Sequence, residues 1–266
     1  MPAPPEPGAT ETERARVTGP GADLARFYEE AYRAGDGERL GRWRALGAEG
    51  KADHVALLCQ RAGLRPERVA EVGCGDGALL TELGRRSFAQ SLTGFEISEA
   101  AVAIARDRAI AGLQAIEPFD GARVPREAGA FDLGILSHVL EHVPAPAALL
   151  REVARVSGAV VVEVPLEANL SARRAGKRIA AEEIGHIQLL DRAAVHRIAR
   201  EAGLRVAEEM ADPLPLEVHV FFAETAAARA RQTLKAGVRH GVFAIAPRAA
   251  ERLFTLHYAA LCLPAP

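Results

Sequence analysis

The segment that decides the fold is RVAEVGCGDGALL, residues 68–80. An apolar run ends abruptly in three glycines at alternate positions, Gly73, Gly75 and Gly77, and a helical pattern starts at Ala78. Glycine tolerates positive φ and lets a ligand approach the backbone closely, and a helix N-terminus offers free N–H groups and the positive end of a dipole. The segment therefore predicts a strand, a tight turn and a helix start that hold a nucleotide-like cofactor.

Two kinds of cofactor fit this turn. At Gly73, Gly75 and Ala78 the segment fits the dinucleotide fingerprint G-x-G-x-x-G/A, which is weak evidence when it stands alone. From Glu71 onward it is E-x-G-x-G-x-G. A carboxylate at Glu71 would repel a pyrophosphate, but it would favour an amino group or hold the glycine turn through its amides. Glu71 thus argues for a cofactor with an amino-acid moiety.

Three downstream segments continue the pattern. A predicted strand at 91–96 ends in Glu96, 23 positions after Gly73 (96 − 73), where a carboxylate would accept both hydroxyls of a ribose. A third strand closes with the acid of EPFDG, residues 117–121. The segment FDLGILSHVLEHV, residues 131–143, fits a fourth strand and the helix after it.

In this order, over about residues 67–165, the motifs resemble those of the class I S-adenosylmethionine-dependent methyltransferases. The "FD…SHVLEHV" form resembles their ubiquinone-biosynthesis-like, small-molecule branch. The resemblance implies an acid beside the adenine and the backbone after strand four beside the methionine part, with S-adenosylhomocysteine as the product. The cofactor-binding residues expected on this basis are Tyr28, Glu71, Gly73, Cys74, Gly75, Gly77, Glu96, Ile97, Asp120, Gly121, Ser137, His138 and His142.

The fold expected is α/β. Apolar strands that alternate with helices predict a parallel sheet covered on both faces. Two later strands, 204–210 and 216–223, are too close for a crossover helix and should be antiparallel. The resemblance implies a Rossmann-like seven-stranded, mostly parallel sheet with one reversed strand.

We expect four parts in the chain. Residues 1–20 have the composition of a disordered tail, and 21–50 form an N-terminal helical cap in which Tyr28 or Tyr32 covers the cofactor or anchors the helix to the core. The methyltransferase domain should span 51–224, with a lid-like insertion at 165–190. A C-terminal helical extension should fill 225–266, with helices at about 225–237 and 247–262.

Composition bounds the partners. The 266 residues carry a formal net charge of −2, so no overall field attracts nucleic acid or an anionic membrane. Three widely spaced cysteines argue against a disulfide framework and fit a reducing cytoplasm. Neither an apolar run long enough to span a membrane nor a secretory signal is visible. We expect a cytoplasmic monomer or homodimer without nucleic-acid or membrane partners.

Catalytic residues are less constrained by the sequence than cofactor residues. Methyl transfer from a sulfonium mainly requires the acceptor and the methyl group to be held in line, and a base is needed only if the acceptor loses a proton. His186 lies at the end of the long segment, before a helix that Asp191 would cap. It is the first candidate for a base or an acceptor-orienting group, followed by His138 and Glu167. Packing of the lid is the alternative role for His186.

A metal site is not expected. His138, Glu141 and His142 match H-x-x-E-H, a zinc signature of inverzincin peptidases. Pro144 and Pro146 follow at once, so the helix would have at most a couple of turns. We interpret the match as accidental.

The function expected is methyl transfer from S-adenosylmethionine to a small-molecule acceptor, through oxygen, nitrogen or carbon, with secondary metabolism as one setting. Basic residues in the long segment suggest an anionic acceptor or simply a solvated face: Arg173, Arg174, Lys177 and Arg178. An RNA or protein methyltransferase is the alternative, disfavoured by SHVL at 137–140 in place of an Asn/Asp-Pro-Pro-Tyr type of motif. An NAD(P)-dependent dehydrogenase is the more distant one.

Overall fold

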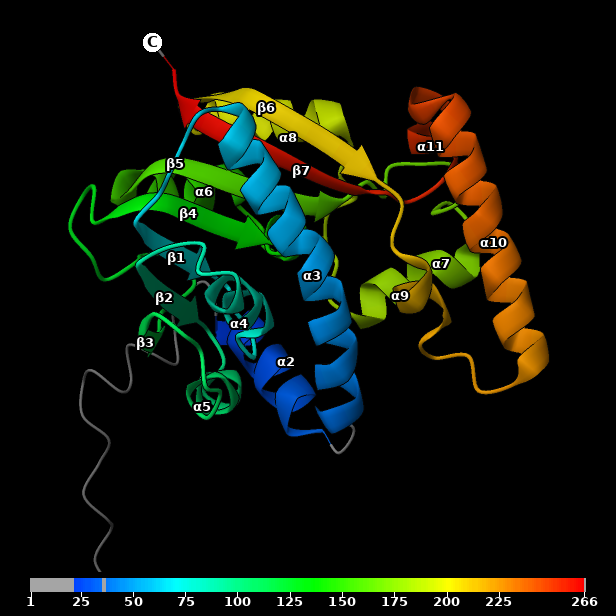
Figure 1. Cartoon of the computed structure of the whole chain (residues 1–266), viewed down its shortest axis with the longest axis horizontal. Helices are drawn as coiled ribbons and strands as arrows, with labels where there is room; N and C mark the ends of the chain where they lie inside the picture. Colours follow the sequence, from blue (N-terminus) through cyan, green and yellow to red (C-terminus); the bar gives the residue numbers. More distant parts are fainter. Residues whose placement is uncertain (1–21, 35–36, 266) are drawn as a thin grey trace, which may run out of the picture.

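The structure is a computed structural model that describes residues 22–34 and 37–265, so the tail expected at 1–20 lies outside the described residues. In the described part, seven strands form one sheet in the order β3-β2-β1-β4-β5-β7-β6, with helices on both faces (Figure 1). β7 is antiparallel to both of its neighbours, β5 and β6, and the other strand pairs are parallel, so β7 is the one reversed strand in the described sheet, which confirms the predicted fold class. The strands are β1 Arg68–Val72, β2 Ser91–Glu96, β3 Leu113–Pro118, β4 Phe131–Ser137, β5 Ser157–Pro165, β6 Leu204–Asp212 and β7 His257–Pro264.

The helices divide between the two faces of the sheet. Helices α3, α4 and α5 share one buried cluster with the strands, and α6 and α8 share the other. Their bounds are α3 Gly37–Arg61, α4 Ala78–Arg85, α5 Glu99–Arg106, α6 Pro146–Val156 and α8 Arg192–Glu201. The remaining helices surround the carboxyl ends of the strands or lie beyond them: α2 Ala22–Arg33, η1 Leu140–His142, α7 Ala175–Glu183, α9 Leu216–Val220, α10 Ala226–Ile245 and α11 Pro247–Leu253.

Successive side chains of strand β5 alternate between the two faces of the sheet. Val160, Val162 and Val164 pack with α6 and α8, whereas Ala159 and Val161 pack on the α3 side. Because successive side chains alternate, Glu163 belongs to the α3 side. The one acid in this apolar strand is therefore directed at α3.

The predicted strand at 216–223 is wrong, because these residues form α9 and the turn after it. The antiparallel partner of β6 is β7, which lies between β5 and β6. Alternating apolar residues at 216–223 fit a half-buried strand in isolation. A strand with neighbours on both sides must be apolar on both faces, and residues 258–262 of β7 are buried throughout.

The structure differs from the expected division of the chain in two places. The predicted helix at 247–262 is divided into α11 and β7, so the segment 225–266 supplies a central strand and is not a separate helical extension. The expected boundary at residue 50 falls inside α3, which continues without interruption to Arg61. Within the described residues, no helix combines the length and the apolar character needed to cross a bilayer.

Candidate active site

The glycine turn after β1 has no room for side chains. Gly73, Gly75 and Gly77 all have positive φ, between 54° and 79°. A Cβ on Gly75 would lie 2.4 Å from the hydroxyl oxygen of Tyr32, and a Cβ on Gly73 would lie 2.5 Å from Cγ2 of Val139. The turn thus depends on glycine both for its backbone angles and for close approach by its neighbours.

Glu96, at the end of β2, is tied to this turn. Its Oε2 accepts the N–H of Gly75 at 2.8 Å, and its Oε1 accepts the N–H groups of Ile97 and Ser98 at 2.8 and 3.0 Å. Burial raises its pKa, although these amide donors oppose the shift. The side chain is thereby fixed where the cofactor ribose is expected, and its contact with the ribose hydroxyls stays a prediction.

Glu71, in β1, is a second buried acid near the glycine turn. It is 3% exposed, and its Oε2 has no hydrogen-bond partner among the residues that the structure describes. Burial raises its pKa well above the ordinary value. A buried carboxyl oxygen without a partner in a cavity wall suits a ligand that brings a donor, such as the amino group of a methionine moiety.

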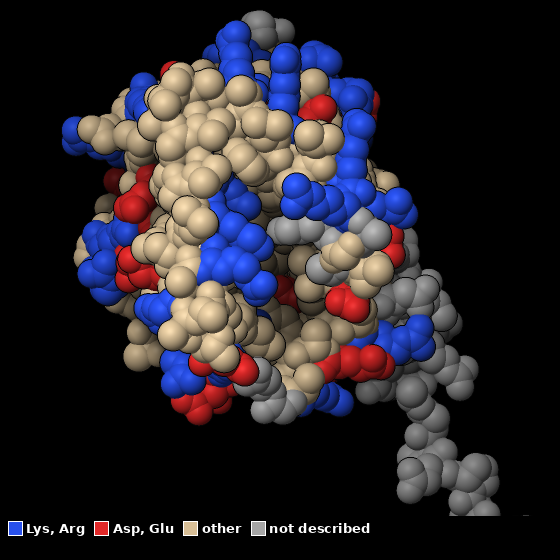
Figure 2. Space-filling model, turned by 90° about the vertical axis from the view of Figure 1, so that its right-hand side faces the viewer, with Lys and Arg blue, Asp and Glu red and all other residues tan. Residues whose placement is uncertain are grey.

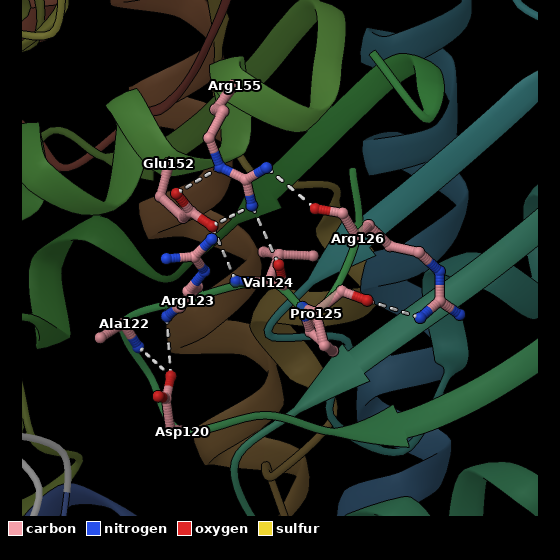
Figure 3. A network of polar contacts seen from close by, with 8 residues as sticks. All are labelled: Asp120, Ala122, Arg123, Val124, Pro125, Arg126, Glu152 and Arg155. Carbon is pink, nitrogen blue, oxygen red and sulfur yellow. Dashed lines mark hydrogen bonds and ion pairs between the residues drawn. The ribbon is translucent and has the colours of Figure 1, made fainter. Parts of the chain in front are cut away.

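The loop after β3 is held by polar contacts, as Figure 3 shows. Asp120 accepts the N–H groups of Ala122 and Arg123 at 2.8 and 2.7 Å. Glu152 and Arg155 of α6 hold the loop by further bonds to the backbone at residues 124–126. Asp120 itself is exposed, and the adjoining Gly121 lines the cavity described next. The role expected for Asp120 beside the adenine stays a prediction.

A cavity of about 1450 Å³ extends from the glycine turn to α10. All of the predicted cofactor and catalytic residues line it except Gly77 and Asp120. Helix α2 covers it with two tyrosines: Tyr32 stands over Gly75, and the ring of Tyr28 lies 5.6 Å from that of His142. The cavity is large enough for a cofactor and an acceptor together.

One histidine–carboxylate cluster, the Glu163 cluster, lies on the α3 side of β5. Glu163 Oε1 contacts Nδ1 of His54 at 2.8 Å, and Oε2 accepts the hydroxyl of Ser137 at 2.7 Å. The other nitrogen of His54 contacts Asp212 of β6 at 2.8 Å. Burial opposes protonation of His54, but its two carboxylate partners raise its pKa to about 10. His54 is therefore an imidazolium held between two acids at neutral pH.

Two further histidines adjoin this cluster. The ring of His138 lies 4.9 Å from that of His257, and Nδ1 of His257 lies 3.9 Å from Glu163 Oε1. Burial lowers the pKa of both histidines to about 3, so both are neutral. His138 has a φ of 56°, an uncommon conformation for a residue other than glycine.

A second cluster, the Glu141 cluster, comprises Glu141, His142 and His186 with Glu167. The rings of His142 and His186 are 4.7 Å apart, and Nδ1 of His186 contacts Glu167 Oε2 at 2.6 Å. Burial opposes protonation of His186, yet the Glu167 carboxylate raises its pKa. Neither carboxyl oxygen of Glu141 has a hydrogen-bond partner in the described part of the chain.

Backbone bonds hold this cluster in place. The carbonyl oxygen of Glu141 accepts the N–H groups of Ile187 and Gln188, at 2.9 and 3.1 Å. Nδ1 of His142 donates to the carbonyl oxygen of Gly185 at 3.0 Å. The segment that carries His186 is therefore fastened to η1, opposite Glu141 and His142.

A family model described as a methyltransferase domain matches residues 43–209, more than half of the chain. The chain belongs to this methyltransferase family. Ubiquinone biosynthesis O-methyltransferase of Pseudomonas aeruginosa (strain LESB58) is 31% identical over 139 residues, which cover 49% of this chain and 55% of that protein. The chain thus spans about half the length of the first curated relatives that it matches.

Two solved structures show the same fold. Magnesium protoporphyrin IX methyltransferase from Synechocystis PCC 6803, with bound SAH, has a TM-score of 0.59 at 14% identity and covers 93% of this chain and all of its own. The cyclase SpnF has a TM-score of 0.54 at 19% identity, with 82% and 81% covered. Family and fold confirm the class I methyltransferase resemblance and its cofactor, S-adenosylmethionine. The glycine turn, Glu71 and Glu96 fit that cofactor.

Sequence reasoning named some of the residues of this candidate site and did not name others. The structure brings His186 and Glu167 into contact, and His138 lines the same cavity, whereas the catalytic roles expected for the three residues stay predictions. His54, Asp212 and His257 were missed, because they come from α3, β6 and β7, far apart in sequence. The available signal was Glu163, an acid inside an apolar strand, which needs a buried partner.

Basic side chains gather at the far end of the cavity, where Figure 2 shows Lys and Arg around a hollow. Arg174, Lys235 and Arg239 line the cavity there. Arg239 contacts His219 at 2.8 Å and lies over the ring of Phe254, but no carboxylate of the described residues lies within ion-pair distance of it. Burial lowers its pKa. Of the cations singled out in the sequence whose side chains the structure describes, only Arg174 lines the cavity.

Proposed function

We propose that this methyltransferase transfers the methyl group of S-adenosylmethionine to a hydroxyl oxygen of a small acceptor that carries an anionic group. The observation that carries the proposal is the pair of His186 and Glu167, 2.6 Å apart in the wall of the cavity that also contains the glycine turn. A hydroxyl must lose its proton as it is methylated, and a histidine held by a carboxylate can accept such a proton as a general base. The name of the Pseudomonas relative, an O-methyltransferase, points the same way.

Different residues of the chain bind the cofactor and position the acceptor. The glycine turn, Glu71 and Glu96 bind and orient the cofactor, which supplies an electrophilic methyl group on a sulfonium. The acceptor then lies between the glycine turn and α10, with its hydroxyl at His186. In-line positioning of this kind can supply about 7–11 kcal/mol of the barrier.

The environment of Arg239 supports the proposal that the acceptor carries an anionic group. A partly buried guanidinium without a carboxylate partner among the described residues suits a carboxylate or phosphate from a ligand, bound through paired hydrogen bonds. Lys235, one turn before Arg239 on α10, and Arg174 add positive charge at this end.

The test is a screen of the purified chain with methyl-labelled S-adenosylmethionine against hydroxylated small molecules in matched pairs, each pair differing only by a carboxylate. We expect label in the ether product and preference for the anionic member. Arg239→Gln should reduce that preference, whereas Arg231→Gln, an exposed change on the same helix, should not. Transfer only to nitrogen or carbon would contradict the hydroxyl assignment. Cofactor binding without transfer to any acceptor would instead indicate other chemistry on this fold.

A further inference from the structure

Helix α2 covers the cavity with side chains that are only partly buried or exposed. In residues 24–33, where its side chains are described, none is fully buried. Tyr32 stands over Gly75 of the glycine turn, so the inward face of α2 lies beside the expected cofactor position. A cofactor in the cavity would therefore supply apolar contact that helps to hold α2 in place. The side chains of α2 that line the cavity are Leu24, Phe27, Tyr28, Ala31 and Tyr32.

Polar contacts connect α2 with the cofactor side of the site. Glu29 accepts the hydroxyl of Ser98 at 2.8 Å and the N–H of Ala100 at 3.0 Å. Ser98 in turn donates its N–H to Glu96, the acid expected at the ribose, at 3.0 Å. The position of α2 is thus linked to the residues that are expected to hold the cofactor.

Helix α2 also contacts the residue that precedes His186. A Cβ on Gly185 would lie 3.0 Å from Cε1 of Phe27 and 3.5 Å from Nδ1 of His142. Gly185 has a φ of 83°, and its carbonyl oxygen accepts Nδ1 of His142 at 3.0 Å. A glycine with a ring on either side has little room to move. The contact with Phe27 therefore restricts the backbone immediately before His186.

A series of rings continues from α2 to His186. The ring centroids of Phe27 and Tyr28 are 5.2 Å apart, and those of Tyr28 and His142 are 5.6 Å apart. His142 and His186 follow at 4.7 Å, and each of the three pairs is edge-on. These are separations at which aromatic rings attract one another. On its other side the ring of His186 contacts Glu167. Displacement of α2 would therefore remove contacts on which the position of His186 depends.

The exposure of Phe27 argues against a mainly stabilising role. Its side chain is 37% exposed, whereas Phe95 in the core is completely buried. Because the stabilisation by an apolar side chain grows with the area removed from water, Phe27 contributes less to stability than a core phenylalanine. Its distinguishing contact is the one with Gly185.

We propose that Phe27 and Gly185 are positioning residues that make the placement of His186 depend on the bound cofactor. The cofactor packs against α2, α2 holds the ring of Phe27 against Gly185, and Gly185 holds His186 towards the acceptor. Because such a coupling is reciprocal, a change at Gly185 must also change the affinity for the cofactor. The inference rests on the proposed function only for the part of His186 in the reaction.

The first test follows the ring signal of His186 in the NMR spectrum of the full-length protein, assigned by its absence in His186→Gln. Saturation with S-adenosylhomocysteine should shift this signal in the wild type. In Phe27→Ala at saturation, the signal should stay at its position without ligand, and Glu30→Gln, an exposed change on the same helix, should respond like the wild type. A purely structural contribution of Phe27 would leave the response intact.

The second test is a double-mutant cycle on the affinity for S-adenosylhomocysteine, measured by calorimetry. Phe27→Ala and Gly185→Ala should each weaken binding by about fivefold or more, the usual range for coupled sites. The double variant should bind at least about twofold more tightly than the product of the two separate effects predicts, because the added methyl group no longer meets the ring.

Four results would overturn the proposal. They are a His186 signal that does not respond to S-adenosylhomocysteine in the wild type, a wild-type response in Phe27→Ala, unchanged affinity in Gly185→Ala, and additive effects in the cycle. Saturable binding of S-adenosylhomocysteine shows that each variant is folded. Because neither test needs an acceptor, their failure leaves methyl transfer to hydroxyl groups standing, and failure of the acceptor screen leaves the coupling standing.

Discussion

The Glu163 and Glu141 clusters lie at the same edge of the sheet and contain the same kinds of side chain, but their polar atoms are satisfied to different degrees. Glu163 joins β5 to α3 through His54 and to β4 through Ser137, and His54 continues the chain of contacts to β6. Glu141 is just as buried, yet its two carboxyl oxygens have no hydrogen-bond partner among the described residues.

The difference separates a structural role from a ligand-binding one. A buried charge with a full set of partners stabilises an arrangement of elements, and removal of one partner leaves an uncompensated charge. A buried acid without partners contributes little to stability in that state, and its surroundings suit a ligand that brings the missing partner. Matched substitutions in the two clusters should therefore affect different properties.

The largest effect is expected on turnover in the Glu141 cluster. His186→Ala should lower turnover by about 10²–10⁴-fold, the usual contribution of a group that governs the acceptor proton, with little change in affinity for S-adenosylhomocysteine. His196→Ala, on α8 and in contact with Glu209 outside the Glu141 cluster, serves as the control. Near-normal turnover of His186→Ala at saturating acceptor would remove His186 from the reaction.

Next in size is the loss of stability on breaking the Glu163 cluster. Glu163→Gln should lower the free energy of unfolding by about 3–5 kcal/mol, because it leaves the buried His54 imidazolium with one carboxylate fewer. Urea unfolding monitored by circular dichroism measures this change. A loss below about 1 kcal/mol would mean that the two clusters do not differ as described.

The same cluster predicts how stability depends on pH. The pKa of His54 is raised from 6.5 to about 10 in the folded chain, so its contribution is complete below pH 6.5 and is lost as the pH rises toward 10. Burial opposes ionisation of Glu163, but His54 lowers its pKa overall, so its contribution is present above pH 4.5 and is lost as the pH falls. The stability difference between wild type and Glu163→Gln should thus be largest between pH 4.5 and pH 6.5. A difference that still increases from pH 7 to 10 would contradict this assignment.

The smallest effect is expected from the matched change in the other cluster. Glu141→Gln should alter the stability of the chain by no more than about 1 kcal/mol, because its carboxyl oxygens have no hydrogen bond with the described residues to lose. The same urea experiment measures it. A loss as large as that of Glu163→Gln would show that Glu141 is held by partners of its own.

The sequence could predict the part of the site that is local in the chain. The glycine turn, Glu96 and the strand–helix order follow from short-range patterns, and the fold class is confirmed. The position of β7 could not be predicted, because alternation at 216–223 fits a strand equally well and only the sheet decides which segment becomes central.

The Glu163 and Glu141 clusters also could not be predicted from local sequence patterns. Glu141 and His142 are adjacent in the sequence, but η1 is a single turn that does not present His138 and His142 as a helical i, i+4 pair. The expectation of a short helix is confirmed, whereas the interpretation of the H-x-x-E-H match as accidental stays a prediction. His186, whose ring lies next to that of His142, comes from the long segment before α8, and no local pattern pairs it with η1. Sequence reasoning could name His186 but could not find its neighbours.

The most direct test of the account is the binding of S-adenosylhomocysteine at the glycine turn, measured by calorimetry on the wild type and on Glu96→Ala, with NAD⁺ as the comparison ligand. The wild type should bind S-adenosylhomocysteine and not NAD⁺. Glu96→Ala should weaken binding by about 1.5–3 kcal/mol, the range for hydrogen bonds to a charged group. Binding of NAD⁺ by the wild type, or equal affinity of the two proteins for S-adenosylhomocysteine, would contradict the assignment of this edge as the cofactor site.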